Sequence, residues 1–416
     1  MADVRPLCGV RFDILRSGPV GPLIAPPYDV VAAPTNAAEF SIRKIEGVDL
    51  GAGNDHTWAA DRYRRWLEQG VLRRDPTPMV YVHHHQFDHR GVRHLRTGLM
   101  ARVRLADWSE RIVLPHEQTT PGPRNERLDR LRAVQANLSP LYFLYRDPDG
   151  LIRELLASRV PGRANFDEHD QMGGAHGLTP MAGTEFHKRL ATAFADRSLF
   201  VADGHHRYEA ALAYRDECRA VSRSHPDALS EFVLALLVAV EDAGVIVRPT
   251  HRLLIGNPGV EPASILQVLY EWFDARRADL ATPMPTTADF ICRVVMTDNY
   301  GAWDLYAKPG NSHRELLPSD RGPAWRSLPI SAVEGIVERI LKNNAQSPDQ
   351  RVLPAVDDLD TVTRVRDGRA DAAFLLPPPS LDRLLAVAEE GDLLPAKSTW
   401  FEPKAPAGLV INDLRL

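Results

Sequence analysis

One stretch of the sequence changes from a strand pattern to a helix pattern across a single Asp-Gly pair. In "SLFVADGHHRYEAALAYRDECRAV", residues 198–221, the apolar run "LFV" is typical of a buried strand. Asp203 and Gly204 follow as a tight turn, with Asp203 as the predicted N-cap, and the remainder has helical periodicity. The pattern therefore predicts a strand, a turn and a helix in direct succession.

The predicted helix begins with two histidines and an arginine: His205, His206 and Arg207. Backbone N–H groups at a helix N-terminus favour an anion, and arginine offers a fork of donors that matches phosphate oxygens. We interpret the turn as an anion site, with phosphate as the anion. A capped helix with exposed histidines is one alternative. A metal site is another, although adjacent histidines diverge on a helix.

Glu117 is the second candidate for a chemical role. It follows Pro115 and His116 in "VLPHEQTTPGPRNERLDR" (113–130), on a predicted loop from which its carboxylate can project. Near a phosphate, a carboxylate can accept the proton of an attacking hydroxyl or hold Mg²⁺. The alternative is a surface glutamate with neither role.

Composition excludes several classes of protein. A length of 416 residues predicts two or three domains, and a net charge of -5 gives no global basic surface for nucleic acid. No apolar run reaches membrane-spanning length. The cysteines, Cys8, Cys218 and Cys292, are too scattered for a disulfide scaffold or a thiolate zinc site. Because the N-terminus also lacks a signal-peptide pattern, we expect a reduced, cytoplasmic protein that binds neither nucleic acid nor membrane.

Three consecutive histidines, 83–85, lie in a hairpin predicted over 79–89 and 93–105. Strand alternation sends the middle histidine to the face opposite the other two, so all three cannot face one ion. We expect this tract to be a solvated strand. A helix over 57–72 and a buried strand over 231–240 are also predicted.

Two of these motifs together resemble the archaeal ADP-dependent free serine kinases, which have a ParB/sulfiredoxin fold. The motifs are "PHEQ" at 115–118 and "DGHHR" at 203–207. The resemblance implies that Glu117 is the catalytic base. It also implies that the "DGHHR" turn holds the phosphates of ADP or ATP. The residues implied for the phosphates and Mg²⁺ are Asp203, Gly204, His205, His206 and Arg207, with Asp203 as the metal ligand.

The whole chain is similar to a larger bacterial family of unknown function. The motifs that carry this similarity are "APPYDVV" (25–31), "LPHEQT" (114–119), "ANLSPLYFLY" (136–145), "VADGHHRYEAAL" (201–212), "RPTHRLL" (248–254) and "LPAKSTWFEPK" (394–404). This chain departs from the family pattern at Trp400, where tyrosine is usual, and at Arg124, where lysine is usual.

Further polar residues are candidates for binding a substrate. They are His116, Tyr28, Asp29, His251, Arg252, Lys397, Ser398 and Thr399. Each group has a structural alternative: turn packing for the pair after two prolines, a satisfied buried pair for 251–252, and a strand cap for 397–399.

These observations predict an α/β (α+β) protein in three parts: an N-terminal segment 1–75, a ParB/sulfiredoxin-like nucleotide domain 76–225, and a C-terminal α+β lobe 226–416. The leading hypothesis is a kinase that phosphorylates the hydroxyl of a free amino acid, with L-serine as the first candidate and a nucleotide as donor. One alternative is a ParB-like regulatory protein that binds or hydrolyses a nucleotide without a phosphoryl acceptor. The other is a metal-dependent hydrolase that uses the histidine pair. The oligomeric state is left open.

Overall fold

A computed structural model of the chain divides into two compact units. It describes residues 1–26, 38–46, 56–158, 168–170, 173–221, 225–256, 260–297, 300–310, 312–344 and 351–415. The first unit comprises Met1–Pro115, Thr119–Ile246 and Pro403–Leu416. The second comprises His116–Gln118 and Val247–Glu402.

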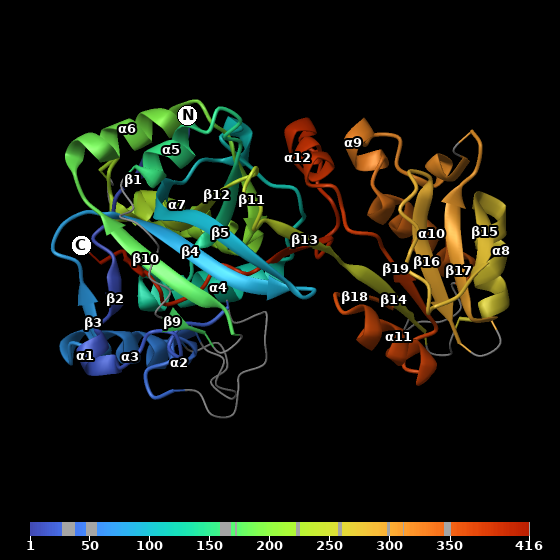
Figure 1. The fold of residues 1–416 in the computed structure, drawn as a ribbon, viewed down its shortest axis with the longest axis horizontal. Coiled ribbons are helices and arrows are strands. Elements are labelled where there is room, and N and C mark those ends of the chain that lie inside the picture. The colour runs from blue at the N-terminus through green and yellow to red at the C-terminus, as the bar shows by residue number, and fades with distance from the viewer. Residues whose placement is uncertain are drawn as a thin grey trace. The chain divides into compact units, whose positions relative to one another are not determined.

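The first unit is built on a mixed nine-stranded sheet with the order β6-β11-β8-β12-β5-β4-β10-β9, to which β1 is added beside β5 (Figure 1). Its strands are β1 Val4–Arg5, β4 Val80–His89, β5 Val92–Arg104, β6 Val113–Leu114, β8 Leu141–Tyr145, β9 Glu168–His169, β10 Ala175–Met181, β11 Leu199–Asp203 and β12 Phe232–Ala239. Two small pairs accompany the sheet: β2 Val10–Phe12 with β3 Leu72–Arg74, and β7 Ala136–Asn137 with β21 Asn412–Asp413.

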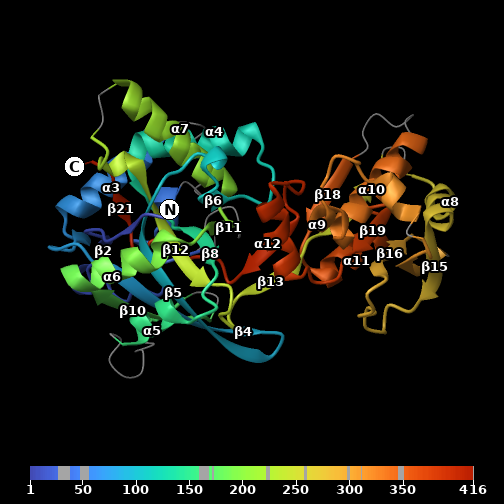
Figure 2. The same ribbon diagram turned by 90° about the horizontal axis from the view of Figure 1, so that it is seen from above.

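The apolar strands of this sheet form the centre of the core. Residues 141–145 of β8 are all buried, as are the first seven residues of β12, because both faces of the central strands are covered. The helices of this unit are α1 Ile14–Ser17, α2 Arg43–Glu46, α3 Thr57–Glu68, α4 Pro121–Val134, α5 Leu151–Ala157, α6 Thr184–Ala195 and α7 His205–Val221. Helices α4 and α7 pack side by side (Figure 2), and apolar residues of α4, α5, α6 and α7 join one core with the sheet.

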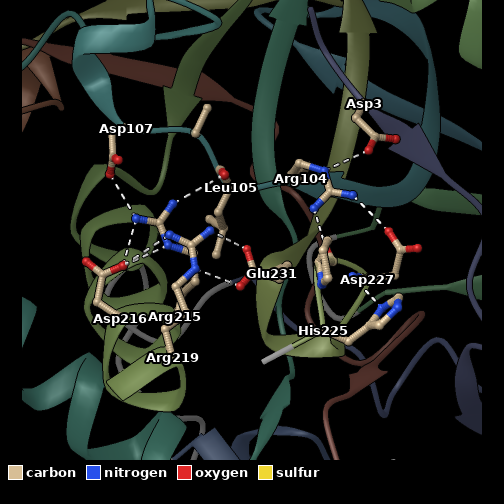
Figure 3. A network of polar contacts seen from close by, with 12 residues as sticks. Asp3, Arg104, Leu105, Asp107, Arg215, Asp216, Arg219, His225, Asp227 and Glu231 are labelled. Carbon is tan, nitrogen blue, oxygen red and sulfur yellow. Dashed lines mark hydrogen bonds and ion pairs between the residues drawn. The ribbon is translucent and has the colours of Figure 1, made fainter. Parts of the chain in front are cut away.

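An ion-pair network with two buried members, Arg215 and Glu231, fixes the second half of α7 (Figure 3). The guanidinium of Arg215 donates to Asp107 at 2.9 Å, and that of Arg219 donates to Glu231 at 2.5 and 2.8 Å. Glu231 is itself buried, and its backbone carbonyl accepts the N–H of Leu105. Paired charges of this kind resist displacement, because separating one partner leaves a buried charge unpaired. The network therefore holds the helix that carries the "DGHHR" turn.

The second unit contains an antiparallel six-stranded sheet with the order β15-β17-β16-β19-β14-β18. Its strands are β14 His251–Ile255, β15 Phe273–Ala278, β16 Phe290–Met296, β17 Ala302–Ala307, β18 Arg351–Ala355 and β19 Ala372–Leu375, with a separate pair β13 Ile246–Pro249 and β20 Thr399–Glu402. Its helices are α8 Pro262–Trp272, α9 Pro323–Arg326, α10 Pro329–Asn343, α11 Asp358–Arg366 and α12 Leu381–Glu390. Val362 and Val365 of α11 join an apolar cluster with residues of four strands.

The fold class is the α+β arrangement that the sequence predicts, and several local elements are confirmed. The hairpin and the buried strand over 231–240 correspond to β4–β5 and β12. The helix predicted over 57–72 is α3, which ends at Glu68, because Leu72 begins β3. The division into 1–75, 76–225 and 226–416 differs from the two compact units. The ParB/sulfiredoxin-like character of the central part stays a prediction. None of the helices in the described part of the chain is both long enough and apolar enough to cross a membrane.

The expectation of a solvated histidine tract is wrong for two of the three residues. His83 and His85 point to the same face of β4 and are 0% and 4% exposed, whereas His84 is half-buried. The reason is non-local: β10 pairs with β4 and places His176 opposite His85. The rings of His85 and His176 stack with centroids 4.0 Å apart. The strand alternation was predicted correctly, but the sequence does not reveal which strand covers this face.

Buried histidines make the stability of the protein depend on pH. Burial lowers the pKa of His83 and His85, and the nearby His176 lowers both further. Below the unfolded pKa of about 6.5, the unfolded chain therefore binds protons that the folded protein rejects. We expect the free energy of unfolding to fall with decreasing pH, by about 1.4 kcal/mol per pH unit for each histidine. Urea unfolding at pH 7.5 and 5.5 measures this, and His85→Phe should flatten the profile. An equal midpoint at both pH values would contradict the prediction.

Candidate functional site

The predicted turn between strand and helix is present at the junction of β11 and α7. Residues 199–202 of β11 are buried, Asp203 ends the strand, and the helix begins at His205. Gly204 lies between them with φ +103°, a backbone conformation that favours glycine. Gly204, rather than Asp203, is therefore the residue that precedes the helix. The carbonyl of Gly204 accepts the N–H of Tyr208 at 2.9 Å. The predicted N-cap is off by one residue, because Asp203 still belongs to the strand.

The carboxylate of Asp203 is held between two cations. One oxygen accepts a hydrogen bond from the Arg207 guanidinium at 2.7 Å, one helical turn along α7. The other accepts from the Lys404 ammonium at 2.5 Å. The side chain of Lys404 is only 8% exposed. The turn therefore gathers a guanidinium and an ammonium around one carboxylate, at the positive end of a 17-residue helix.

Arg207 is fixed by more than its ion pair. Its second terminal nitrogen donates to the hydroxyl of Ser139 at 3.0 Å and to the carbonyl of Pro140 at 2.7 Å. It also lines a small pocket together with Arg127 and Arg130 of α4. Those two arginines pair with Glu126. Three arginines and one acidic residue, Glu46, thus line this pocket, and the excess of positive charge favours an anion.

The two histidines of the motif differ in their surroundings. His205 is 7% exposed and packs into the protein. His206 is half-buried, and its Nε2 accepts the backbone N–H of Thr120 at 2.9 Å, so this nitrogen is unprotonated in that arrangement. Thr119 donates from its hydroxyl to Glu209 at 2.6 Å. The segment that follows "PHEQ" in the chain is therefore bonded to the first turns of α7.

The conformation of Gly204 leads to a prediction about stability. A Cβ at this position would lie 2.6 Å from Cδ2 of Leu141 and 3.0 Å from Nη2 of Arg207, in addition to the unfavourable φ. We expect Gly204→Ala to lower the free energy of unfolding by about 1–3 kcal/mol. Gly122→Ala in α4 is the matched control, because nothing lies within 4 Å of its added Cβ. The control should be neutral or stabilise by up to about 1 kcal/mol. Equal urea midpoints for the two variants would refute the argument.

Glu117 lies in the second unit, beside the loop that contains the "KST" motif. One carboxylate oxygen accepts from the backbone N–H of Thr399 at 2.6 Å and from its hydroxyl at 2.5 Å. The other accepts from the N–H of Lys397 at 3.3 Å. A parallel bridge between Glu117 and Leu394 aligns the two segments. The side chain of Glu117 is 11% exposed, so its carboxylate is largely enclosed and oriented by backbone donors.

The other predicted residues of the "PHEQ" and "KST" motifs join this arrangement. His116 is buried, and its Nε2 is 2.8 Å from the hydroxyl of Thr399. Ser398 is buried and donates to the carbonyl of Pro395, whereas Lys397 is exposed and has φ +60°. The structure therefore brings His116, Glu117 and Thr399 together.

The predicted pair at 251–252 is buried and bonded within the protein. His251 is 0% exposed; its Nδ1 accepts the N–H of Leu376, and its Nε2 is 2.7 Å from Asp358. Arg252 donates to Glu334 at 2.7 Å and to the carbonyl of Lys397 at 3.0 Å. These contacts correspond to the satisfied buried pair that the sequence leaves as an alternative. Through its bond to the carbonyl of Lys397, Arg252 also holds the backbone of the "KST" loop. A substrate contact by either residue stays a prediction.

Two predicted residues cannot be placed, and two residues at the site were not predicted. Tyr28 and Asp29 fall outside the described residues. Arg127 and Arg130 line the pocket beside Arg207, and the sequence analysis did not single them out. Their spacing of three residues places them on one face of α4.

Fold and contacts together define an α+β protein whose β11–α7 turn gathers a carboxylate, a guanidinium and an ammonium group. The chain belongs to the family described as "Protein of unknown function (DUF1015)", whose model matches residues 4–357. No curated protein matches the chain.

Several solved structures are similar to this chain at low identity. A free serine kinase in complex with AMP is 12% identical with a TM-score of 0.39, covering 76% of this chain and 92% of that one. A conserved hypothetical protein from Pyrococcus furiosus is 12% identical with a TM-score of 0.37, covering 74% and 93%. SbnI from Staphylococcus aureus, with a C-terminal truncation, is 12% identical with a TM-score of 0.38, covering 74% and 84%. Likenesses at this distance do not define a function.

Proposed function

We propose that this protein is a small-molecule kinase that transfers a phosphoryl group from ADP or ATP to the hydroxyl of a free amino acid, with L-serine as the first candidate. The observation that carries the proposal is the pair of cations, Arg207 and Lys404, held by Asp203 at the N-terminus of α7. Phosphoryl transfer needs chiefly groups that position the phosphates and groups that neutralise their charge, and the two cations can do both.

The phosphates would bind at the β11–α7 turn. Backbone N–H groups at the start of α7 provide donors, and Arg207 is already oriented by Ser139 and Pro140. A side chain that is oriented before the ligand binds loses less conformational entropy on binding. Lys404 and Arg207 would exchange part of their contact with Asp203 for phosphate oxygens, as charge accumulates on the transferring group.

Glu117 would accept the proton of the substrate hydroxyl. As the hydroxyl oxygen forms its bond to the terminal phosphorus, the bond between that phosphorus and the bridging nucleotide oxygen breaks, leaving AMP or ADP. The enclosed carboxylate and its two oriented oxygens support this role, since a general base must be fixed in direction. In the chain, Glu117 stands three residues before Thr120, whose backbone N–H bonds to His206.

Mg²⁺ is compatible with this proposal, with one carboxylate oxygen of Asp203 as its ligand from the protein. Asp203 offers a carboxylate, which is the kind of ligand that Mg²⁺ prefers, and nucleotide phosphates commonly supply further oxygens. The ion would neutralise phosphate charge. Since both oxygens of Asp203 now accept from cations, one of them would have to be released to the metal.

Product analysis tests the proposal. Purified protein is incubated with Mg²⁺, a mixture of hydroxyl amino acids and either ADP or ATP, and the products are separated and identified by mass spectrometry. We expect one phosphorylated amino acid, formed in equal amount to the nucleotide consumed. Nucleotide loss that is independent of every acceptor would instead indicate the regulatory, nucleotide-hydrolysing alternative. Unchanged nucleotide with all acceptors would also contradict the proposal.

A further inference from the structure

A second cluster of side chains that could bind a ligand lies in the first unit, at sequence positions far from the "DGHHR" turn. His85 of β4, His176 of β10 and Asp170 each offer one ligand atom, and these atoms all lie within 4.8 Å of one another. Nε2 of His176 is 2.9 Å from Oδ2 of Asp170, and Nε2 of His85 is 4.0 Å from the same oxygen. His83 contacts this group through His176: its Nε2 lies 2.9 Å from Nδ1 of His176.

His85 is the unusual member of this group. Its side chain is 5% exposed, and neither ring nitrogen has a hydrogen-bond partner among the described residues. A buried polar atom without a partner costs free energy, and such groups commonly mark an absent ion or water. The nitrogen that is 4.0 Å from Asp170 points toward the carboxylate without bonding to it. An unpartnered buried nitrogen beside a carboxylate is the arrangement expected at a ligand site.

The backbone around Asp170 is shaped to bring these atoms together. The N–H of Gly174 donates to Oδ1 of Asp170 at 2.8 Å, and the N–H of Asp170 donates to the carbonyl of Gly174. A Cβ at Gly174 would lie 2.4 Å from Nε2 of His85 and 3.1 Å from Oδ2 of Asp170. Only glycine leaves this space open, so the residue permits the approach of the imidazole to the carboxylate.

We propose that His85, His176 and Asp170 bind a divalent transition-metal ion of the zinc type. Two imidazoles and one carboxylate suit zinc and its neighbours, whereas magnesium prefers oxygen ligands alone. Bonds of about 2.0–2.2 Å in a tetrahedral arrangement place neighbouring ligand atoms about 3.3–3.6 Å apart. The observed separations of 2.9 and 4.0 Å lie on either side of that range, so small side-chain shifts complete the geometry.

His83 has a positioning role in this site. In the metal-bound state, Nε2 of His176 ligates the ion and its Nδ1–H donates to Nε2 of His83, which fixes the ring and its tautomer. The ion would thereby connect β4 and β10 to the turn at Asp170. It is distinct from the magnesium of the proposed kinase reaction in both ligands and chemistry.

Metal binding to the intact protein tests the inference. Chelator-treated protein is titrated with Zn²⁺ in competition with a chromophoric chelator, and with Co²⁺, whose visible absorption reports its ligands. We expect one site and a tetrahedral cobalt spectrum. Loss of a residue that only supports a metal ligand costs up to ~100-fold in affinity. His85→Ala removes a ligand itself, so it should weaken Zn²⁺ binding by more than ~100-fold. Asp170→Asn is the second variant, because the amide keeps the shape of the side chain and can still accept the N–H of Gly174.

The neighbouring His84 supplies the matched control. It points to the opposite face of β4, where it lines a separate pocket, so His84→Ala should leave Zn²⁺ affinity and the cobalt spectrum unchanged. Gly174→Ala should abolish tight binding without removing any ligand. Zn²⁺ affinity that is equal in wild type, His85→Ala and Asp170→Asn would overturn the proposal and leave a buried histidine cluster. Equal losses in His84→Ala and His85→Ala would overturn it as well.

Discussion

Replacement of Glu117 by glutamine is expected to abolish turnover while nucleotide binding persists. The amide retains the shape of the side chain and can still accept from the N–H and hydroxyl of Thr399. It cannot take a proton from an attacking hydroxyl. Because general-base catalysis typically contributes about 10²–10⁴-fold, we expect turnover to fall by that factor. Steady-state transfer rates and a separate nucleotide titration measure the two quantities.

A nearby carboxylate controls for a purely structural effect. Glu402 also accepts hydrogen bonds in the second unit, from Arg248 at 2.9 Å and from the indole of Trp400 at 3.0 Å. Glu402→Gln should therefore keep most of the transfer activity. Full activity in Glu117→Gln would exclude Glu117 as the base. Similar losses in both variants would show that turnover reports only on the integrity of the fold.

Replacement of Arg207 by alanine is expected to weaken nucleotide binding. A hydrogen bond to a charged group contributes about 1.5–3 kcal/mol, so affinity should fall by about 10- to 150-fold. The variant also loses the contacts with Ser139 and Pro140 that orient this side chain. Wild-type binding should weaken with added salt, as expected where phosphate charge is neutralised at a partly exposed site. Calorimetric titration with ADP and ATP measures both effects.

Arg132→Ala is the matched control for this prediction. Arg132 also pairs with carboxylates, Asp129 and Glu217, but its side chain is 46% exposed on α4. An exposed pair of this kind contributes little, so nucleotide affinity should remain that of the wild type. If Arg207→Ala bound nucleotide as tightly as Arg132→Ala, the phosphate site would have to be sought elsewhere in the chain.

Local patterns in the sequence were sufficient for the elements that carry the candidate residues. The apolar run before Asp203 and the helical spacing after Gly204 predicted β11 and α7 correctly. The hairpin of β4 and β5 was likewise predicted from two alternating runs and a short turn. Each of these signals spans a few residues, over which backbone preferences and side-chain periodicity decide the structure.

Contacts between distant segments could not be predicted. Lys404 reaches Asp203 across 201 residues, and Thr399 reaches Glu117 across 282. No pattern within either segment specifies its partner, because pairing is decided by the packing of the whole unit. The same reason explains the burial of His83 and His85, whose partner His176 belongs to another strand.

The division of the chain into units was also decided by long-range pairing. Residues 403–416 return to the first unit, where β21 pairs with β7 and Ile411 pairs with Val10. The three residues His116–Gln118 pack with the second unit instead of with their chain neighbours. Domain boundaries inferred from the sequence divide the chain into consecutive segments, so each stretch is assigned to the same domain as its neighbours in the chain. Such boundaries therefore cannot anticipate segments that cross from one unit to the other.

Phosphorus NMR of the purified protein tests the central claim most directly. The sample contains Mg²⁺, ADP or ATP and a pool of hydroxyl amino acids, and parallel samples contain Glu117→Gln and Arg207→Ala. A phosphotransferase predicts a new phosphomonoester resonance in the wild type that is absent from both variants. Nucleotide that remains intact, or that yields only inorganic phosphate, would contradict the claim and favour a nucleotide-binding regulatory protein.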